Sequence, residues 1–304
     1  MKRALVTGGS GFVGRHLITS LIKKKYKVIN LGRKKLTFPN CQNIALNGIG
    51  NYEEIKSIIF DHQPRYIFHL AASLSDDLIE SMKVNLFYLK HILDSITELG
   101  YANLTKIIVI GSAAEYGYVR EENLPISELQ PTFPYSNYGI SKLAQTNYAI
   151  SWAKKNTGSF LVVLRPFTIS GYGVSEKLAL GNFIKQIKNY DNGMSIKTGN
   201  LKNSRDYIDI KDFVQIIFDI LENPNANNEI INVCSGKSVT LEFILNYLIK
   251  KSSKELFVEP DPKLFRTVDM KDHYGDNSKL LSLINGYVFT SITESLDIIL
   301  REDE

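Results

Sequence analysis

Tyr138 and Lys142, in the segment PYSNYGISKLA at residues 134–144, are the residue pair whose types and spacing best suit acid–base chemistry. Residues four apart project from the same face of a helix, so a lysine ammonium can lie beside the tyrosine phenol. A phenol with a pKa near 10 is a weak acid or base at neutral pH, and a nearby cation favours the phenolate. The same spacing recurs at three other places: Tyr52/Lys56, Tyr207/Lys211 and Tyr247/Lys251. The surroundings of each pair therefore have to decide between proton transfer and an exposed pair on a helix.

A glycine-rich segment lies near the start of the chain. VTGGSGFVGRHL places Gly8, Gly11 and Gly14 between a short apolar run and a helical pattern. Glycines in this position allow a tight turn and let the backbone approach a pyrophosphate at the helix N-terminus. We predict a dinucleotide-binding loop, with Phe12 and Val13 beside the glycines. The alternative is a tight turn with a structural role only.

The expected partner of such a loop, an acidic residue about 20 positions further on, is missing. The chain has no Asp or Glu before Glu53, and its second strand ends in INLGRKK. A carboxylate would repel a 2′-phosphate, whereas arginine can bind one with two donors. We therefore predict NADP(H), held by Arg33 and Lys34, with NAD as the alternative cofactor. Both cations could instead be solvated loop charges.

The elements that position these residues alternate between apolar strands and amphipathic helices as far as Phe167. This order predicts an α/β fold, a Rossmann doubly wound parallel sheet with a smaller C-terminal α/β substrate-binding domain. One helix is expected over residues 81–100 and another over 138–155. Beyond Phe167 helical patterns occur at 207–223 and 241–253, with polar, loop-like stretches between them. We predict an NADP-binding domain over residues 1–165 and a substrate-binding region over 166–304, with 205–235 packing back onto the first domain.

Composition narrows the class of protein. The 304 residues are 44% hydrophobic and 22% charged, with a net charge of +4, which is ordinary for a globular protein. We expect no nucleic-acid partner, no membrane insertion and a cytoplasmic location. Cys41 and Cys234 lie far apart, so we expect reduced thiols and no metal site.

Further motifs follow in a consistent order and spacing. They are FHLAA (68–72), GSAAEYG (111–117), YGISK (138–142), LRPFTISG (164–171), SRDYIDIKD (204–212) and NVCSG (232–236). Together with the glycine segment they resemble the extended short-chain dehydrogenase/reductase family over nearly the whole chain. The resemblance implies an NAD(P)-dependent oxidoreductase and a homodimer.

The resemblance also assigns residues. It implies that Ser112, Tyr138 and Lys142 are catalytic, with Tyr138 exchanging a proton, Ser112 orienting the substrate oxygen and Lys142 holding the cofactor ribose. The other three tyrosine–lysine pairs lack a serine-bearing strand end upstream. The cofactor would also contact the ends of two strands, through Leu70, Ala71, Ala72, Pro166, Phe167 and Ile169.

Most members of this family act on nucleotide-diphosphate sugars, and the serine segment separates their reactions. Ala113 and Ala114 stand where dehydratases carry an acidic pair, and the segment has no cysteine of the kind that epimerase-reductases use. With no acid after the second strand, the chain most resembles NADPH-dependent 4-ketoreductases of 4-keto-6-deoxyhexoses, such as GDP-4-keto-6-deoxy-D-mannose reductase. The alternatives are an NAD-dependent 4-epimerase and a non-catalytic dinucleotide sensor.

The resemblance extends to substrate residues in the second half of the chain. Arg205, Arg266 and Asp269 are expected at the diphosphate and ribose, although either arginine could be a surface ion-pair partner. Asn182 is a phosphate candidate whose alternative role is a helix N-cap. Thr168 stands where the family usually has Asn. The base, the sugar and the stereochemistry at C4 stay open.

Overall fold

The computed structural model describes residues 2–33, 38–191, 194–265 and 270–302. The predicted roles of Lys34, Arg266 and Asp269 therefore fall outside the described residues. Among the helices of the described part, none has the length and apolar character needed to cross a membrane.

The main sheet has seven parallel strands in the order β10-β6-β5-β4-β1-β2-β3. They are β1 (Arg3–Thr7), β2 (Lys27–Gly32), β3 (Cys41–Ala45), β4 (Tyr66–His69), β5 (Lys106–Ile110), β6 (Phe160–Pro166) and β10 (Ile230–Val233). From β1 the chain adds β2 and β3 on one side and then β4, β5, β6 and β10 on the other, so the strand order reverses between β1 and β4. A crevice is expected at this switch point, outside the carboxyl ends of the strands. The predicted Rossmann doubly wound sheet is confirmed.

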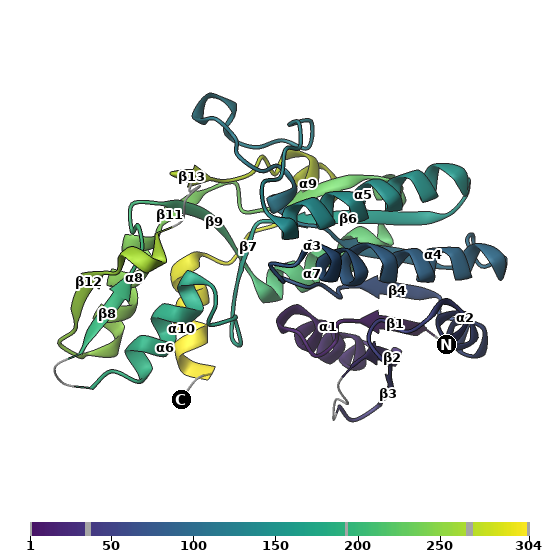
Figure 1. Ribbon diagram of the computed structural model, residues 1–304, viewed down its shortest axis with the longest axis horizontal. Helices are drawn as coiled ribbons and strands as arrows, with labels where there is room; N and C mark the ends of the chain where they lie inside the picture. The colour runs from purple at the N-terminus through teal and green to yellow at the C-terminus, as the bar shows by residue number, and fades with distance from the viewer. Residues whose placement is uncertain (1, 34–37, 192–193, 266–269, 303–304) are drawn as a thin grey trace.

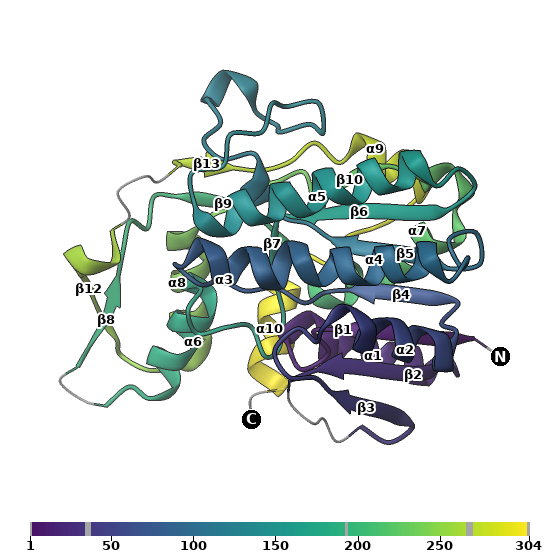
Figure 2. The same ribbon diagram turned by 45° about the vertical axis from the view of Figure 1, so that its right-hand side comes forward.

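Helices cover both faces of this sheet (Figures 1 and 2). One face is covered by α1 (Phe12–Lys23) and α7 (Ile210–Glu222), and the other by α2 (Tyr52–His62), α4 (Tyr88–Glu98) and α5 (Asn137–Lys155). Successive strand residues point to opposite faces, so along β1 Ala4 and Val6 join the first core and Leu5 joins the second. Both faces are buried, which explains the nearly continuous apolar strands.

The single helix predicted over residues 81–100 is interrupted. It consists of α3 (Leu78–Met82), a π-helical turn η1 (Lys83–Phe87) and then α4. Gly100, expected to end the helix, has a φ of 70° and follows the last turn. Such π turns are rare and occur frequently at functional sites.

The C-terminal half forms a smaller unit beside the main sheet, seen at the left of Figure 1. Its strands are β7 (Thr168–Ser170), β8 (Ser195–Thr198), β9 (Ser204–Asp209), β11 (Ser238–Thr240), β12 (Phe257–Pro260) and β13 (Asp272–His273). β9 pairs with β7, β11 and β13, while β8 pairs with β12. Helices α6 (Ala179–Lys188), α8 (Leu241–Ser252) and α10 (Ile292–Glu302) complete it. A separate apolar core unites α6, α8 and α10.

Segment 205–235 connects the two units. β10 extends the main sheet beside β6, and α7 packs against α1. The predicted helix over 207–223 starts too early, because residues 207–209 belong to β9. The domain boundary at residue 165 stays a prediction. The remaining short helices are η2 (Ala113–Glu115), η3 (Glu121–Asn123), η4 (Pro224–Ala226), η5 (Pro262–Leu264) and α9 (Ser278–Leu283).

Candidate active site

The glycine loop joins β1 to α1 at the switch point of the sheet. Gly8 has a φ of 72°, and a Cβ there would lie 2.7 Å from the backbone nitrogen of Ala71. A Cβ on Gly14 would lie 2.3 Å from the carbonyl oxygen of Gly8. Gly11 is the N-cap of α1, which has no side-chain cap and no acid in its first turn. The free amides and the missing side chains leave a cradle that fits a pyrophosphate.

The carboxyl end of β2 fits the adenosine half of a dinucleotide. The buried Asn30 donates from Nδ2 to Asn43 Oδ1 at 3.0 Å, while its own Oδ1 has no partner among the described residues. That oxygen faces the loop, since a Cβ on Gly9 would lie 2.2 Å from it. Arg33 is exposed, and a Cβ on Gly32 would meet no atom closer than 3.8 Å. Among the described residues, this end of β2 thus presents the unpaired Asn30 Oδ1, the exposed Arg33 and space beside the Gly32 Cα.

The other predicted cofactor residues follow β4 and β6 or begin α1. Ala71, Pro166 and Phe167 are buried, Ala72 is exposed, and the others are partly buried: Phe12, Val13, Leu70 and Ile169. The loop after β7 approaches α1, because His16 Nε2 lies 3.0 Å from the carbonyl oxygen of Tyr172. All these residues lie at the carboxyl edge of the sheet.

Ser112, Tyr138 and Lys142 come together from β5 and α5. Ser112 is the N-cap of η2, and Ser136 caps α5 so that Tyr138 lies in its first turn. The Ser112 hydroxyl lies close enough to the Tyr138 phenol to lower its pKa. Lys142 is fully buried and its Nζ donates to the carbonyl oxygen of Ile110 at 2.6 Å and to Gln145 Oε1 at 3.0 Å. The structure thus groups the three predicted catalytic residues.

The protonation of this group differs from the sequence expectation. Burial raises the pKa of Tyr138 to about 12, although the neighbouring Ser112 opposes the shift. Burial lowers the pKa of Lys142 to about 8, against the attraction of Glu115. The phenolate expected beside the lysine is therefore not the favoured form of Tyr138 in the protein alone.

Two residues that sequence analysis did not assign lie beside this group, one in contact with Ser112 and the other linked to Tyr138 through Ser141. Glu115 Oε1 accepts from the backbone nitrogen of Ser112 at 2.9 Å and from Thr146 Oγ1 at 3.0 Å. Asn85, in the π turn, donates from Nδ2 to Ser141 Oγ at 2.7 Å. In the sequence, these residues could have been noticed because Glu115 is a single carboxylate in an otherwise apolar segment and Asn85 is a single amide in an amphipathic helix pattern.

The other tyrosine–lysine pairs have different surroundings. Tyr52 and Lys56 both contact Glu98, and Tyr247 and Lys251 both contact Asp297 at 2.9 Å. Tyr207 is buried within β9. The pairs Tyr52/Lys56 and Tyr247/Lys251 thus have a carboxylate as their partner, in contrast with Tyr138.

A cavity of about 630 Å³ lies beside this edge, between β7, α6, β9 and η5. Thr168, Asn182 and Arg205, the described substrate candidates, all line it. Asn182 lies inside α6, whose N-cap is Leu178, so the N-cap alternative for Asn182 is wrong. The cavity volume suits a small-molecule ligand.

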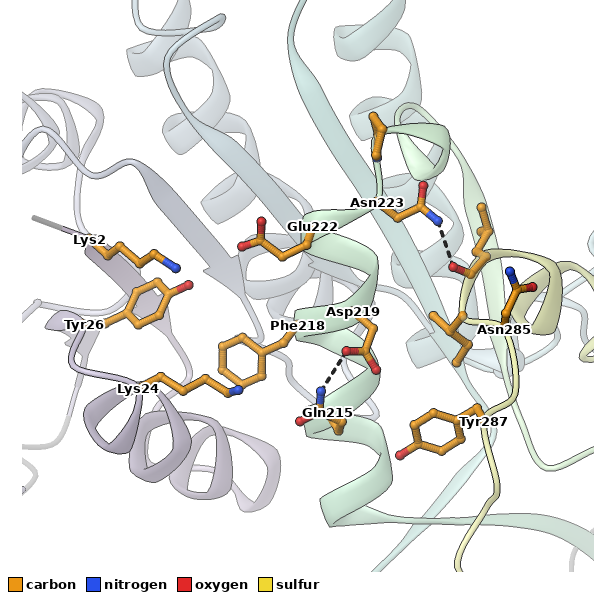
Figure 3. A pocket seen from close by; sticks show the side chains of 13 residues that line it. Lys2, Lys24, Tyr26, Gln215, Phe218, Asp219, Glu222, Asn223, Asn285 and Tyr287 are labelled. Carbon is orange, nitrogen blue, oxygen red and sulfur yellow. Dashed lines mark hydrogen bonds between the residues drawn. The ribbon is translucent and has the colours of Figure 1, made fainter.

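Another cavity, of about 980 Å³, lies at the opposite, amino edge of the main sheet. Figure 3 shows that charges of both signs line it, with Lys2 and Lys24 on one side and Asp219 and Glu222 on the other. It is remote from the glycine loop and Ser112, so it is not the candidate active site. Among the described residues, no group of three or more His, Cys, Asp or Glu side chains could hold a metal ion.

A glycine loop at the switch point of a doubly wound sheet defines a dinucleotide-dependent enzyme of the Rossmann type. The sequence model of the NAD dependent epimerase/dehydratase family matches residues 4–234, and the chain belongs to that family. It is an NAD(P)-dependent oxidoreductase of the extended short-chain dehydrogenase/reductase type.

Its relatives include nucleotide-sugar enzymes. It is 28% identical over 300 residues to GDP-6-deoxy-D-talose 4-dehydrogenase of Aggregatibacter actinomycetemcomitans, covering 97% of this chain and 96% of that protein. It is 25% identical over 312 residues to GDP-6-deoxy-D-mannose reductase of Pseudomonas aeruginosa, covering 100% and 97%. The structure of RMD from Pseudomonas aeruginosa complexed with NADPH has the same fold, with a TM-score of 0.83, 22% identity and coverage of 99% and 98%.

Proposed function

We propose that the protein uses NADPH to reduce the C4 ketone of a nucleotide-diphosphate 4-keto-6-deoxyhexose. The product would be an activated deoxysugar for a surface polysaccharide. The observation that carries this proposal is the acid-free end of β2, with an exposed Arg33 and, among the described residues, space beside Gly32. This end suits a 2′-phosphate, and hence a cofactor that is consumed in a reduction. The names of the two relatives, a 4-dehydrogenase and a reductase of GDP-linked 6-deoxysugars, support the substrate class.

Ser112 and Tyr138 supply the groups that a ketone reduction needs on the substrate oxygen. A bound NADPH supplies the hydride for the carbonyl carbon. The Ser112 hydroxyl orients the carbonyl oxygen, and the Tyr138 phenol, which is protonated at neutral pH, donates a proton to it as charge develops there. Lys142 holds the cofactor ribose with its buried ammonium.

The cavity beside β9 is the proposed site of the nucleotide diphosphate. Arg205 Nη1 donates to the carbonyl oxygens of Ser204 at 2.7 Å and Met270 at 2.9 Å, and these contacts fix the guanidinium in place. Gln186 donates to Asn182 Oδ1 at 2.5 Å. With its oxygen already bound, the Asn182 amide can use its nitrogen to donate to a phosphate. Arg266 and Asp269 complete the proposed diphosphate and ribose contacts. A homodimer and a cytoplasmic location stay predictions.

The test offers the purified protein a panel of GDP-, dTDP- and CDP-linked 4-keto-6-deoxyhexoses with NADPH. The loss of NADPH absorbance is followed and the product sugar is identified. We expect stoichiometric consumption of NADPH with one base strongly preferred. The absence of turnover with every ketosugar would overturn the proposal.

The alternative function is an NAD-dependent nucleotide-sugar 4-epimerase. The unpartnered Asn30 Oδ1 favours it, because a buried acceptor could receive a ribose hydroxyl in place of the usual carboxylate. An epimerase would carry tightly bound NAD when purified and would interconvert sugars without net cofactor consumption. Release of the cofactor by denaturation, followed by its identification, separates the two functions.

A further inference from the structure

Glu115 is a fully buried carboxylate beside the candidate catalytic group, and the proposed reaction gives it no role. Its Oε2 accepts from Arg165 Nε at 2.8 Å, and the side chain of Arg165 is only 4% exposed. Gly111 makes room for this carboxylate, since a Cβ there would lie 2.5 Å from Glu115 Oε1. A buried charge of this kind is costly unless it is paired, so its position calls for an explanation.

The contacts of Glu115 join three segments that carry the site. Through the backbone nitrogen of Ser112 it fixes the serine turn, and through Thr146 it holds α5. Thr146 lies one helical turn beyond Lys142 on the same face of α5, so this contact fixes the helix that also carries Tyr138. Through Arg165 the carboxylate is linked to β6, whose last residue, Pro166, is predicted to contact the cofactor.

The charge of Glu115 is balanced within the same cluster. The Arg165 guanidinium lies 4.8 Å from the centre of the Tyr116 ring, and the Tyr116 hydroxyl donates to Asn232 Oδ1 at 2.7 Å. The carboxylate thus has three donors, one of which is the paired cation Arg165. A neutral side chain could not bind Ser112 and Thr146 and also satisfy Arg165.

We propose that Glu115 is a positioning residue: it fixes Ser112 relative to the helix that carries Tyr138 and Lys142, and it sets the charge around Lys142. This inference rests on the proposed roles of those three residues. The titratable groups around Lys142 are Glu115 on the serine turn, Tyr138 on α5 and His69 on β4. Around Glu115 they are Arg165 on β6 and Tyr116, which in turn faces Glu128. The negative charge of Glu115 raises the pKa of Lys142, so its loss should lower that pKa.

The test follows Lys142 by NMR in the ligand-free protein, with lysine isotope-labelled at Cε. The resonance is assigned by its loss in Lys142→Met, and its midpoint in the unmodified protein should be near the pKa of about 8. Glu115→Gln should lower the midpoint by about one pH unit, because the negative charge that favours the ammonium is lost. Glu128→Gln is the matched control and should leave it unchanged.

The direction of the shift separates a charge effect from disturbed packing. If the cluster were only structural, loosening it would admit water and move the midpoint upward in Glu115→Gln. An unchanged or raised midpoint in this variant would overturn the charge role. The titration needs neither substrate nor cofactor, so its failure is distinct from a failure of the proposed function.

A kinetic arm tests the positioning role. Glu115→Gln keeps an oxygen for Ser112 and Thr146, whereas Glu115→Ala removes both hydrogen bonds. We expect kcat to be about 10–100-fold lower in the alanine variant than in the glutamine variant, with KM nearly the same, because small misplacements of a catalytic group are costly. Equal kcat values would overturn the positioning role. If the alanine variant does not fold, Glu115→Asp, whose shorter side chain cannot hold both contacts, takes its place.

Discussion

Tyr138 is the residue whose protonation state bears most directly on the direction of the reaction. A phenol with a pKa of about 12 is protonated throughout the physiological range, and a proton donor is what a ketone reduction requires. Ser112 lies beside this phenol, as the proposal that both hydroxyls serve one substrate oxygen requires. Lys142 contributes less to the phenol than its spacing suggested, because its ammonium donates to Ile110 and Gln145.

Tyr138→Phe removes the proposed proton donor with little change in shape. We expect kcat to fall by about 10²–10⁴-fold, the usual contribution of a general acid, while the Kd for NADPH stays close to its original value. Turnover with a ketosugar and binding of NADPH by fluorescence measure the two effects. Tyr52→Phe and Tyr247→Phe are the matched controls and should keep the original kcat. A nearly unchanged kcat in Tyr138→Phe would place the chemistry elsewhere.

Arg33 and Gly32 should together decide the choice of cofactor. Arg33→Ala removes a charge-assisted contact worth about 1.5–3 kcal/mol, so the KM for NADPH should rise by roughly one to two decades while that for NADH barely changes. Adding Gly32→Asp, whose Cβ would come no closer than 3.8 Å to any described residue other than its chain neighbours, should shift the preference further towards NADH. The ratio of kcat/KM for the two cofactors measures the effect. Equal weakening of both cofactors would show that Arg33 does not contact the phosphate.

At the scale of elements, the sequence predicted the helices and strands of the main sheet better than the interruptions within them. The amphipathic pattern over residues 81–100 is continuous, so it could not reveal the π turn. That turn places Asn85 where it accepts from the backbone nitrogen of Ser73 and donates to Ser141, and these contacts come from distant segments. Residues 207–209 were assigned to a helix because their apolar spacing continues that of α7. They form a strand because β7 pairs with them, which no local pattern encodes.

Asp206 should stabilise the joint between β9 and two loops. Its Oδ1 accepts from the backbone nitrogen and hydroxyl of Ser235, and its Oδ2 accepts from the backbone nitrogens of Gly236 and Gly275. Asp206→Asn would turn an NH₂ group towards one of these donor pairs. We expect the free energy of unfolding to fall by about 1–3 kcal/mol, measured by urea denaturation. Asp261→Asn is the control, because Asp261 is a helix N-cap and Asn caps a helix as well as Asp does. It should leave the free energy of unfolding nearly unchanged.

At the scale of the whole molecule, the site residues come from segments far apart in the chain. Ser112, Tyr138 and Lys142 were assigned from the order of motifs that resembles a known family, because the tyrosine–lysine spacing alone also fits three other pairs. Glu115 and Arg165 were not predicted as a pair, because 50 positions separate them and only the packing of η2 against β6 brings them into contact. Arg205, Asn182 and Thr168 were proposed separately for the substrate, and the structure places all three around one cavity.

Two separate ligand sites should stabilise the protein independently. NADPH at the glycine loop and a nucleoside diphosphate in the cavity beside β9 each bind only the folded chain. At a concentration about 100 times its Kd, each should add about 2.7 kcal/mol to the free energy of unfolding, enough to raise the Tm by several degrees.

Arg205→Ala separates these two contributions. Its guanidinium contacts the Ser204 and Met270 carbonyls at the cavity, so the variant should lower the Tm slightly without ligand. We expect it to lose most of the Tm rise with GDP, or with whichever nucleoside diphosphate stabilises the unmodified protein most, while it keeps the full rise with NADPH. Lys237→Ala, at an exposed position on the loop before β11, is the control and should keep both rises. Loss of both rises in Arg205→Ala would indicate general damage to the fold. An undiminished rise with the nucleoside diphosphate would exclude Arg205 from the diphosphate site and move the proposed substrate position away from β9.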